Sequence, residues 1–135
     1  RFITDARFKQ SLATVFGADT QPTESELNDF LEVFKYNDGR RIAHKLIRYM
    51  RERQTNRERW VAALNSINVP FRFINGLADK VSGAHLVERF RQVCPHLDDI
   101  VELENVGHYP QFEVPATVLK KYLEFRRRHA FAPAD

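Results

Sequence analysis

Apolar residues in the first half of the chain recur at the spacing of a helix, and residues 1–66 contain no convincing strand. Segment 23–36 is the clearest example. Thr23 and Glu26 are spaced there as a capping box, and an apolar stripe follows them. Asn37-Asp38-Gly39 then supplies residues typical of a turn. Further helices are expected within 5–16, 42–50 and 60–64.

From Asn68 onward the pattern alternates between strand and helix. The predicted order is a strand at 68–76, a helix at 83–93, a strand at 98–104, a loop at 106–115 and a helix at 117–129. Parallel strands need such a crossover helix between them, so this order predicts a βαβ unit of the α/β class. Two parallel strands are not stable alone, because both faces of such a sheet are normally covered. The remaining strands are expected upstream.

Composition agrees with a globular chain. The sequence has 135 residues, of which 43% are hydrophobic, enough to form a core. It starts at Arg1, inside an amphipathic segment without the regions of a signal peptide, so we expect a fragment or a processed piece. No apolar run is long enough for a transmembrane helix. The single Cys94 excludes an internal disulfide and favours a reducing compartment such as the cytoplasm.

The charges are mixed, with 21 basic and 18 acidic residues, and give no strong indication of nucleic-acid binding. A basic helical module for nucleic acid would rest only on 48–59 and 126–128, and a solvated helix face or an acidic partner also explains 48–59. Cys94, His96 and His85 lie near one another in sequence, but their spacing lacks the second ligand pair of a metal site. We therefore expect no metal.

Two residues that can exchange protons follow the predicted strands. Asp79 comes three residues after the first strand and His108 about four after the second. Since parallel strands end at the same edge of a sheet, both side chains are expected there, where a carboxylate can fix the tautomer of an imidazole. Two simpler interpretations remain open. Asp79 would cap the helix that begins near Ser82, and His108 would be a half-buried loop residue bonded to the backbone.

Residues 69–125 resemble the C-terminal end of α/β-hydrolases, whose last two core strands carry G-x-x-D and G-H-x-P motifs. The corresponding residues here are Gly76-Leu77-Ala78-Asp79 and Gly107-His108-Tyr109-Pro110, and the latter is followed by Glu113 and Pro115. The resemblance covers roughly half of the chain. It implies that Asp79 is the acid and His108 the general base of a catalytic triad, following the nucleophile in chain order.

The helical first half resembles the cap that this family inserts between core strands. Segments 16–30, 37–54 and 57–64 are most similar to the mesoderm-specific transcript group, near the haloalkane dehalogenase and epoxide hydrolase branch. The implied architecture is a partial α/β-hydrolase fold. Residues 1–66 would form the cap, and 67–135 would form the last two parallel strands and the helices of the core sheet.

Aromatic residues are the candidates for contacts with an apolar substrate. Cap tyrosines polarise the epoxide oxygen in epoxide-hydrolase-like enzymes, which would suit Tyr36 and Tyr49, although ordinary packing explains both. Trp60 is either an anchor between cap and core or a substrate contact. Since ligand sites are often concave and lie between domains, the candidate substrate-binding residues are Phe34, Tyr36, Tyr49, Trp60 and Tyr109.

The sequence lacks the nucleophile that a triad requires. None of its five glycines frames a nucleophile elbow, and Ser82, beside Gly83, is on the loop of Asp79. The missing N-terminal half of the core would supply the nucleophile and the oxyanion hole. We therefore expect this chain to provide the acid and the base for hydrolysis of a small apolar ester, epoxide or haloalkane, without a metal or organic cofactor. The alternative is a non-catalytic relative that uses the fold for binding.

Overall fold

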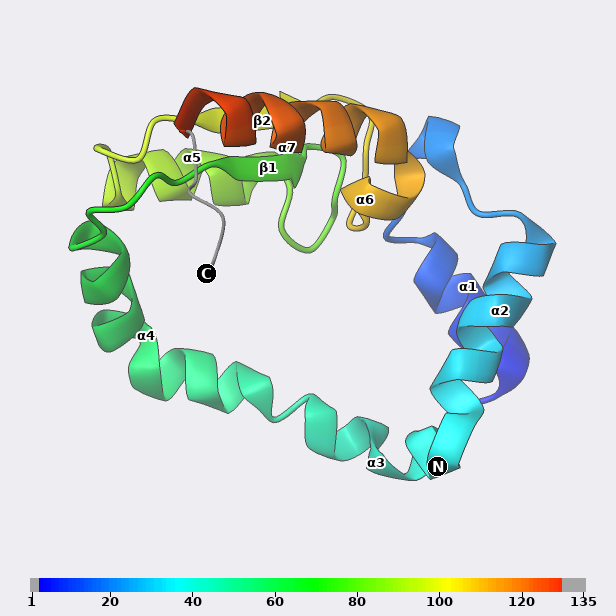
Figure 1. Ribbon diagram of the computed structural model, residues 1–135. Coiled ribbons are helices and arrows are strands. Elements are labelled where there is room, and N and C mark those ends of the chain that lie inside the picture. Colours follow the sequence, from blue (N-terminus) through cyan, green and yellow to red (C-terminus); the bar gives the residue numbers. More distant parts are fainter. Residues whose placement is uncertain (1–2, 130–135) are drawn as a thin grey trace, which may run out of the picture. The chain divides into compact units, whose positions relative to one another are not determined.

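The computed structural model describes residues 3–129 and contains two compact units (Figure 1). Of the described residues, unit 1 comprises 3–14 and 22–67, and unit 2 comprises 15–21 and 68–129. The chain passes from unit 1 to unit 2 after Ile67, close to the position at which the apolar pattern changes from helical to alternating. Nothing in that pattern separates 15–21 from the helices on either side of it.

Unit 1 is helical and begins with α1 (Asp5–Ala13) and α2 (Glu24–Lys35). The predicted capping box of α2 is confirmed: the Glu26 N–H donates to the Thr23 hydroxyl, and the Glu26 carboxylate accepts from the Thr23 N–H at 2.7 Å. The two helices pack through buried leucines of α2 and through the stacked rings of Phe8 and Phe34, 4.4 Å apart. Helix α2 is followed by the short turn η2 (Tyr36–Asp38).

The rest of unit 1 differs from the expected division into helices. Helix α3 (Gly39–Leu46) ends before residue 50, and α4 (Tyr49–Asn65) continues through the basic segment without a break. That segment favours a helix despite its polarity, because Arg, Glu and Gln are good helix formers. The Asn56 amide also donates to the Glu52 carboxylate one turn earlier, at 3.2 Å. Within these two described helices no residue is buried.

Unit 2 contains β1 (Phe73–Gly76), α5 (Ala84–Val93), β2 (Ile100–Leu103), α6 (Pro110–Glu113) and α7 (Pro115–His129). The strands are parallel, with Phe73 opposite Ile100 and Gly76 opposite Leu103, so the predicted βαβ pairing is confirmed. The core beside the strands is formed by a small set of apolar residues: Phe16, Val87, Cys94, Leu97, Leu103 and Val106.

Helix α6 was not expected. It lies within segment 106–115, which the sequence predicted to be a loop. Pro110 occupies its first turn, where a residue without an N–H is tolerated. Two backbone N–H groups, of Phe112 and Glu113, donate to the carbonyl of Tyr109 at 2.8 and 2.9 Å. These bonds form one helical turn directly after the loop of His108.

An ion pair lies at the opposite end of the strands from Asp79 and His108. The buried guanidinium of Arg72 donates to the Asp99 carboxylate at 2.9 Å and to the carbonyl of Lys121 at 2.7 Å, which connects the strand starts to α7. The Asp99 carboxylate also contacts Arg128 at 3.4 Å. Among residues 3–129, no helix combines the length and the apolar character needed to cross a membrane.

Candidate active site

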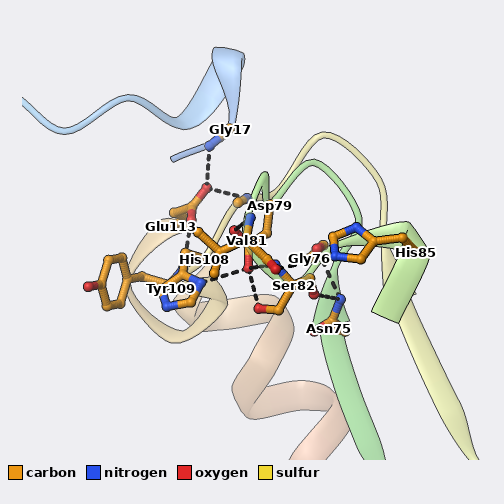
Figure 2. Close-up of polar contacts among 11 residues, drawn as sticks. Gly17, Asn75, Gly76, Asp79, Val81, Ser82, His85, His108, Tyr109 and Glu113 are labelled. Carbon is orange, nitrogen blue, oxygen red and sulfur yellow. Dashed lines mark hydrogen bonds and ion pairs between the residues drawn. The ribbon is translucent and has the colours of Figure 1, made fainter. Parts of the chain in front are cut away.

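Asp79 lies on the loop between β1 and α5, with only 5% of its surface exposed. Its carboxylate accepts hydrogen bonds from the backbone N–H groups of Val81 (2.8 Å) and Ser82 (3.0 Å) and from the Ser82 hydroxyl (Figure 2). The Asn75 amide donates to the Ser82 carbonyl at 3.0 Å and so connects the loop to the strand. Burial acts to raise the pKa of Asp79, but the donors from Ser82, His108 and Val81 outweigh it and lower that pKa below 3.8.

His108 lies on the loop after β2, and its Nδ1 atom is 2.6 Å from the Asp79 Oδ2 atom (Figure 2). An ionised carboxylate can only accept hydrogen bonds, so Nδ1 carries a hydrogen, and in the neutral imidazole Nε2 then keeps its lone pair. The side chain of His108 is 36% exposed. Within the described part of unit 2, no hydrogen bond is made by its Nε2 atom. This nitrogen can therefore accept a proton from a bound molecule.

The two simpler interpretations of this pair account for only part of what is observed. Asp79 accepts hydrogen bonds from its own loop. The N-cap residue of α5 is Gly83, however, so Asp79 is not the capping residue of that helix. The backbone N–H of His108 does donate to the Val15 carbonyl at 2.8 Å, while its ring bonds to Asp79. Asp79 and His108 thus interact directly, although 29 residues separate them.

Two glycines allow the loops that carry Asp79 and His108 to approach each other closely. A Cβ atom on Gly76 would collide with the carbonyl oxygens of Val106 and Gly107, and one on Gly107 would collide with the backbone of the 15–21 segment. The Ala78 N–H also donates to the Val106 carbonyl at 2.9 Å. The glycines of both sequence motifs therefore have a steric reason that is independent of catalysis.

Glu113, at the end of α6, is a site residue whose contacts the sequence did not predict. Its carboxylate accepts from the N–H groups of Gly107 (2.7 Å), Tyr109 (3.0 Å) and Gly17 (2.9 Å) (Figure 2). It also accepts from the Thr20 hydroxyl. Burial acts to raise the pKa of Glu113, but these four donors outweigh it and lower that pKa. Gly17 and Thr20 are 96 and 93 residues away in sequence, so no local signal indicates the contact.

The aromatic candidates for substrate contact occupy different environments. In unit 2, the half-buried Tyr109 packs on Phe16 and lies edge-on to the His108 ring, with centroids 5.0 Å apart. In unit 1, Phe34 lines an open concavity of about 1000 Å³ together with Ile3, Phe8, Arg40 and Ile42. The exposed fractions of Tyr36, Tyr49 and Trp60, also in unit 1, are 82%, 50% and 41%.

The residues weighed as metal ligands do not gather in the described structure. Cys94 is buried, His96 is exposed, and the Nε2 atom of His85 lies 3.2 Å from the Val81 carbonyl. Across residues 3–129, no group of three or more His, Cys, Asp or Glu side chains is arranged to hold a metal ion.

Comparison with known proteins identifies relatives over most of this chain. It is 37% identical over 119 residues to the mesoderm-specific transcript protein of Mus musculus, and 36% identical over 119 residues to the Homo sapiens homolog. It is 33% identical over 115 residues to the putative hydrolase LipZ of Mycobacterium tuberculosis. These alignments cover 85 to 87% of the chain.

The shared segment is only part of each relative. The chain spans 36% of the length of the mesoderm-specific transcript proteins and 40% of LipZ. No family model and no solved structure matches the chain. Together, the relatives support a hydrolase-like family for the segment that this chain represents.

Proposed function

We propose that this chain provides the acid, Asp79, and the general base, His108, of an α/β-hydrolase triad. The hydrogen bond of 2.6 Å between the buried, ionised Asp79 and His108 Nδ1 is the observation that carries the proposal. It has the geometry by which a carboxylate fixes a histidine tautomer and stabilises the imidazolium. The name of the relative LipZ, a putative hydrolase, is consistent with this chemistry.

The proposed substrate is a small, largely apolar ester, epoxide or haloalkane. With a serine nucleophile, His108 Nε2 would take the hydroxyl proton as the serine oxygen attacks, and would later return it to the leaving group. With an aspartate nucleophile, the carboxylate would attack the substrate carbon and form a covalent ester, and halide would leave or the C–O bond of the epoxide ring would break. His108 would then remove a proton from the water that hydrolyses it. In both routes Asp79 stabilises the positive charge that develops on His108.

The finer assignments belong to the same proposal. Unit 1 would be the cap, and unit 2 would be the C-terminal part of the α/β-hydrolase core, in the branch of the haloalkane dehalogenases, the epoxide hydrolases and the mesoderm-specific transcript group. The nucleophile and the oxyanion hole would come from residues outside this chain. The aromatic candidates would contact the substrate: Phe34, Tyr36, Tyr49, Trp60 and Tyr109.

Replacement of either member of the pair in the full-length protein tests the proposal. Turnover should be measured with p-nitrophenyl esters, epoxides and haloalkanes. We expect His108→Ala to lower kcat by several powers of ten. Asp79→Asn should lower it by about 10⁴-fold, because an amide can hold the wrong tautomer. His96→Ala and Asp98→Asn are matched controls, since both residues are exposed in the same unit.

The outcomes separate catalysis from the alternative. Unchanged hydrolysis by His108→Ala would refute the assignment. A full-length protein that hydrolyses none of these substrates, and that carries Gly or Ala at the nucleophile position, would favour the non-catalytic binding protein instead.

A further inference from the structure

The backbone around His108 is bonded at three consecutive residues. The N–H groups of Gly107 and Tyr109, which flank the histidine, donate to the Glu113 carboxylate at 2.7 and 3.0 Å. The N–H of His108 donates to the Val15 carbonyl at 2.8 Å. All three bonds restrict the peptide planes that determine where the Cβ atom of His108 lies.

The same carboxylate connects this loop to a segment far away in sequence. Gly17 donates its N–H to Glu113 Oε2 at 2.9 Å, and Thr20 donates its hydroxyl to the same oxygen. Val15, in that segment, is the residue that accepts from His108. One carboxylate thus holds both sides of the histidine and the segment that contacts the histidine backbone (Figure 2).

We propose that Glu113 is a positioning residue, which sets the His108 ring for its bond to Asp79 by holding the backbone on both sides of it. This inference deepens the proposed function, and only its catalytic consequence depends on that function. The position of the His108 ring can be measured without any substrate.

An amide in place of this carboxylate cannot satisfy the same donors. Glu113 Oε2 accepts from Gly17, Thr20 and Gly107, and Oε1 accepts from Tyr109. If the amide oxygen of a glutamine takes the place of Oε2, its NH₂ group faces the Tyr109 N–H, and two donors oppose each other. Glu113→Gln therefore removes at least one bond beside His108 and leaves the volume of the side chain unchanged.

The experiment uses the full-length protein with uniform ¹⁵N labelling, so that the His108 ring and the Tyr109 amide are both observed, well below its melting temperature. In Glu113→Gln we expect the Nδ1 proton resonance of His108 to move upfield or broaden. We also expect amide exchange at Tyr109 to become at least about tenfold faster, because its N–H loses its acceptor. The chemical control is Glu104→Gln, which neutralises an exposed carboxylate of the same unit.

A second control separates positioning from general destabilisation. Arg72→Ala removes a buried ion pair at the opposite end of the strands and should lower the melting temperature without altering the His108 resonance. If Glu113→Gln lowers the melting temperature and leaves the Nδ1 resonance and the Tyr109 exchange unchanged, Glu113 is merely structural and the inference is wrong.

Thr20→Val keeps the inference testable if Glu113→Gln does not fold. It removes only the hydroxyl donor to Glu113. We expect a smaller shift of the same His108 resonance, and no shift would overturn the inference.

In a hydrolysing protein, Glu113→Gln should lower kcat on the order of 10²-fold with little change in KM. If His108→Ala leaves hydrolysis unchanged, the proposed function fails, while the resonance still decides the role of Glu113.

Discussion

The Ser82 hydroxyl is a side-chain donor to the buried Asp79 carboxylate, and it helps to keep that group ionised. Replacement by Ala removes this donor, so Ser82→Ala should raise the pKa of Asp79. The measurement is a ¹³C carboxyl titration. Ser66→Ala is the control, because its hydroxyl bonds to the carbonyl of Ala63 in the other unit. An unchanged titration would mean that the hydroxyl has no net effect on the carboxylate.

The sign of this effect also determines the pH dependence of stability. Since the pKa of Asp79 is lowered by folding, its stabilising contribution is present above its ordinary value of 3.8 and is lost as the pH falls through the lowered value. In Ser82→Ala, folding lowers the pKa of Asp79 by a smaller amount. The variant should therefore lose free energy of unfolding near neutral pH and show a weaker loss on acidification than the unchanged protein.

At the level of single residues, the sequence indicated which side chains belong to the candidate site better than it indicated their contacts. Asp79 and His108 were found because they follow strands that end at one edge of a sheet, which brings them within hydrogen-bond distance. The contacts of Glu113 were not found. Three of its four donors are backbone N–H groups, which every residue except proline carries, so no side-chain pattern marks them.

Among the elements, α2 has the clearest local signal for its own start. Thr23→Ala removes the hydroxyl of its capping box and should lower the free energy of unfolding of unit 1 by about 1 kcal/mol. Denaturant unfolding followed by circular dichroism measures this change in the full-length protein. Ser25→Ala, within the first turn, is the matched control and should have a smaller effect, because Ser25 is not the capping residue. Equal losses in both variants would contradict the role of the box.

Elements were predictable where local chemistry determines them. The capping box of α2 and the apolar runs at β1 and β2 were visible in the sequence. Helix α6 was not, because Gly107, Pro110 and Pro115 are typical of a loop, and the helix is a single turn that begins at Pro110. The helical state of residues 48–59 was among the interpretations of the sequence, but their continuity with 60–64 in one helix from Tyr49 was not predicted, because the basic residues carry no apolar stripe.

For the whole molecule, the small cores predict weak stability of the isolated 135-residue chain. The strands β1 and β2 are the only two in the described sheet, and α7 leaves Leu119, Tyr122 and Leu123 exposed by 43 to 55%. We expect the isolated chain to unfold without a sharp cooperative transition, because too little apolar surface is buried to offset the lost conformational entropy.

Thermal and urea unfolding, each followed by circular dichroism and by Trp60 fluorescence, test this expectation. Broad transitions that do not coincide between the two probes would agree with it. A single sharp transition seen by both probes would show that the chain folds as an autonomous domain.

The assignment of residues 15–21 to unit 2 has a consequence for synthesis on the ribosome. Thr20 is made 93 residues before Glu113, and at roughly 5–20 residues per second this interval lasts about 5–20 s. During that time Gly17 and Thr20 lack their acceptor, and all of α2, α3 and α4 are synthesised before Glu113 is reached. The helices of unit 1 can therefore form first, and the loop of His108 can acquire its final geometry only when the chain returns to a segment made much earlier.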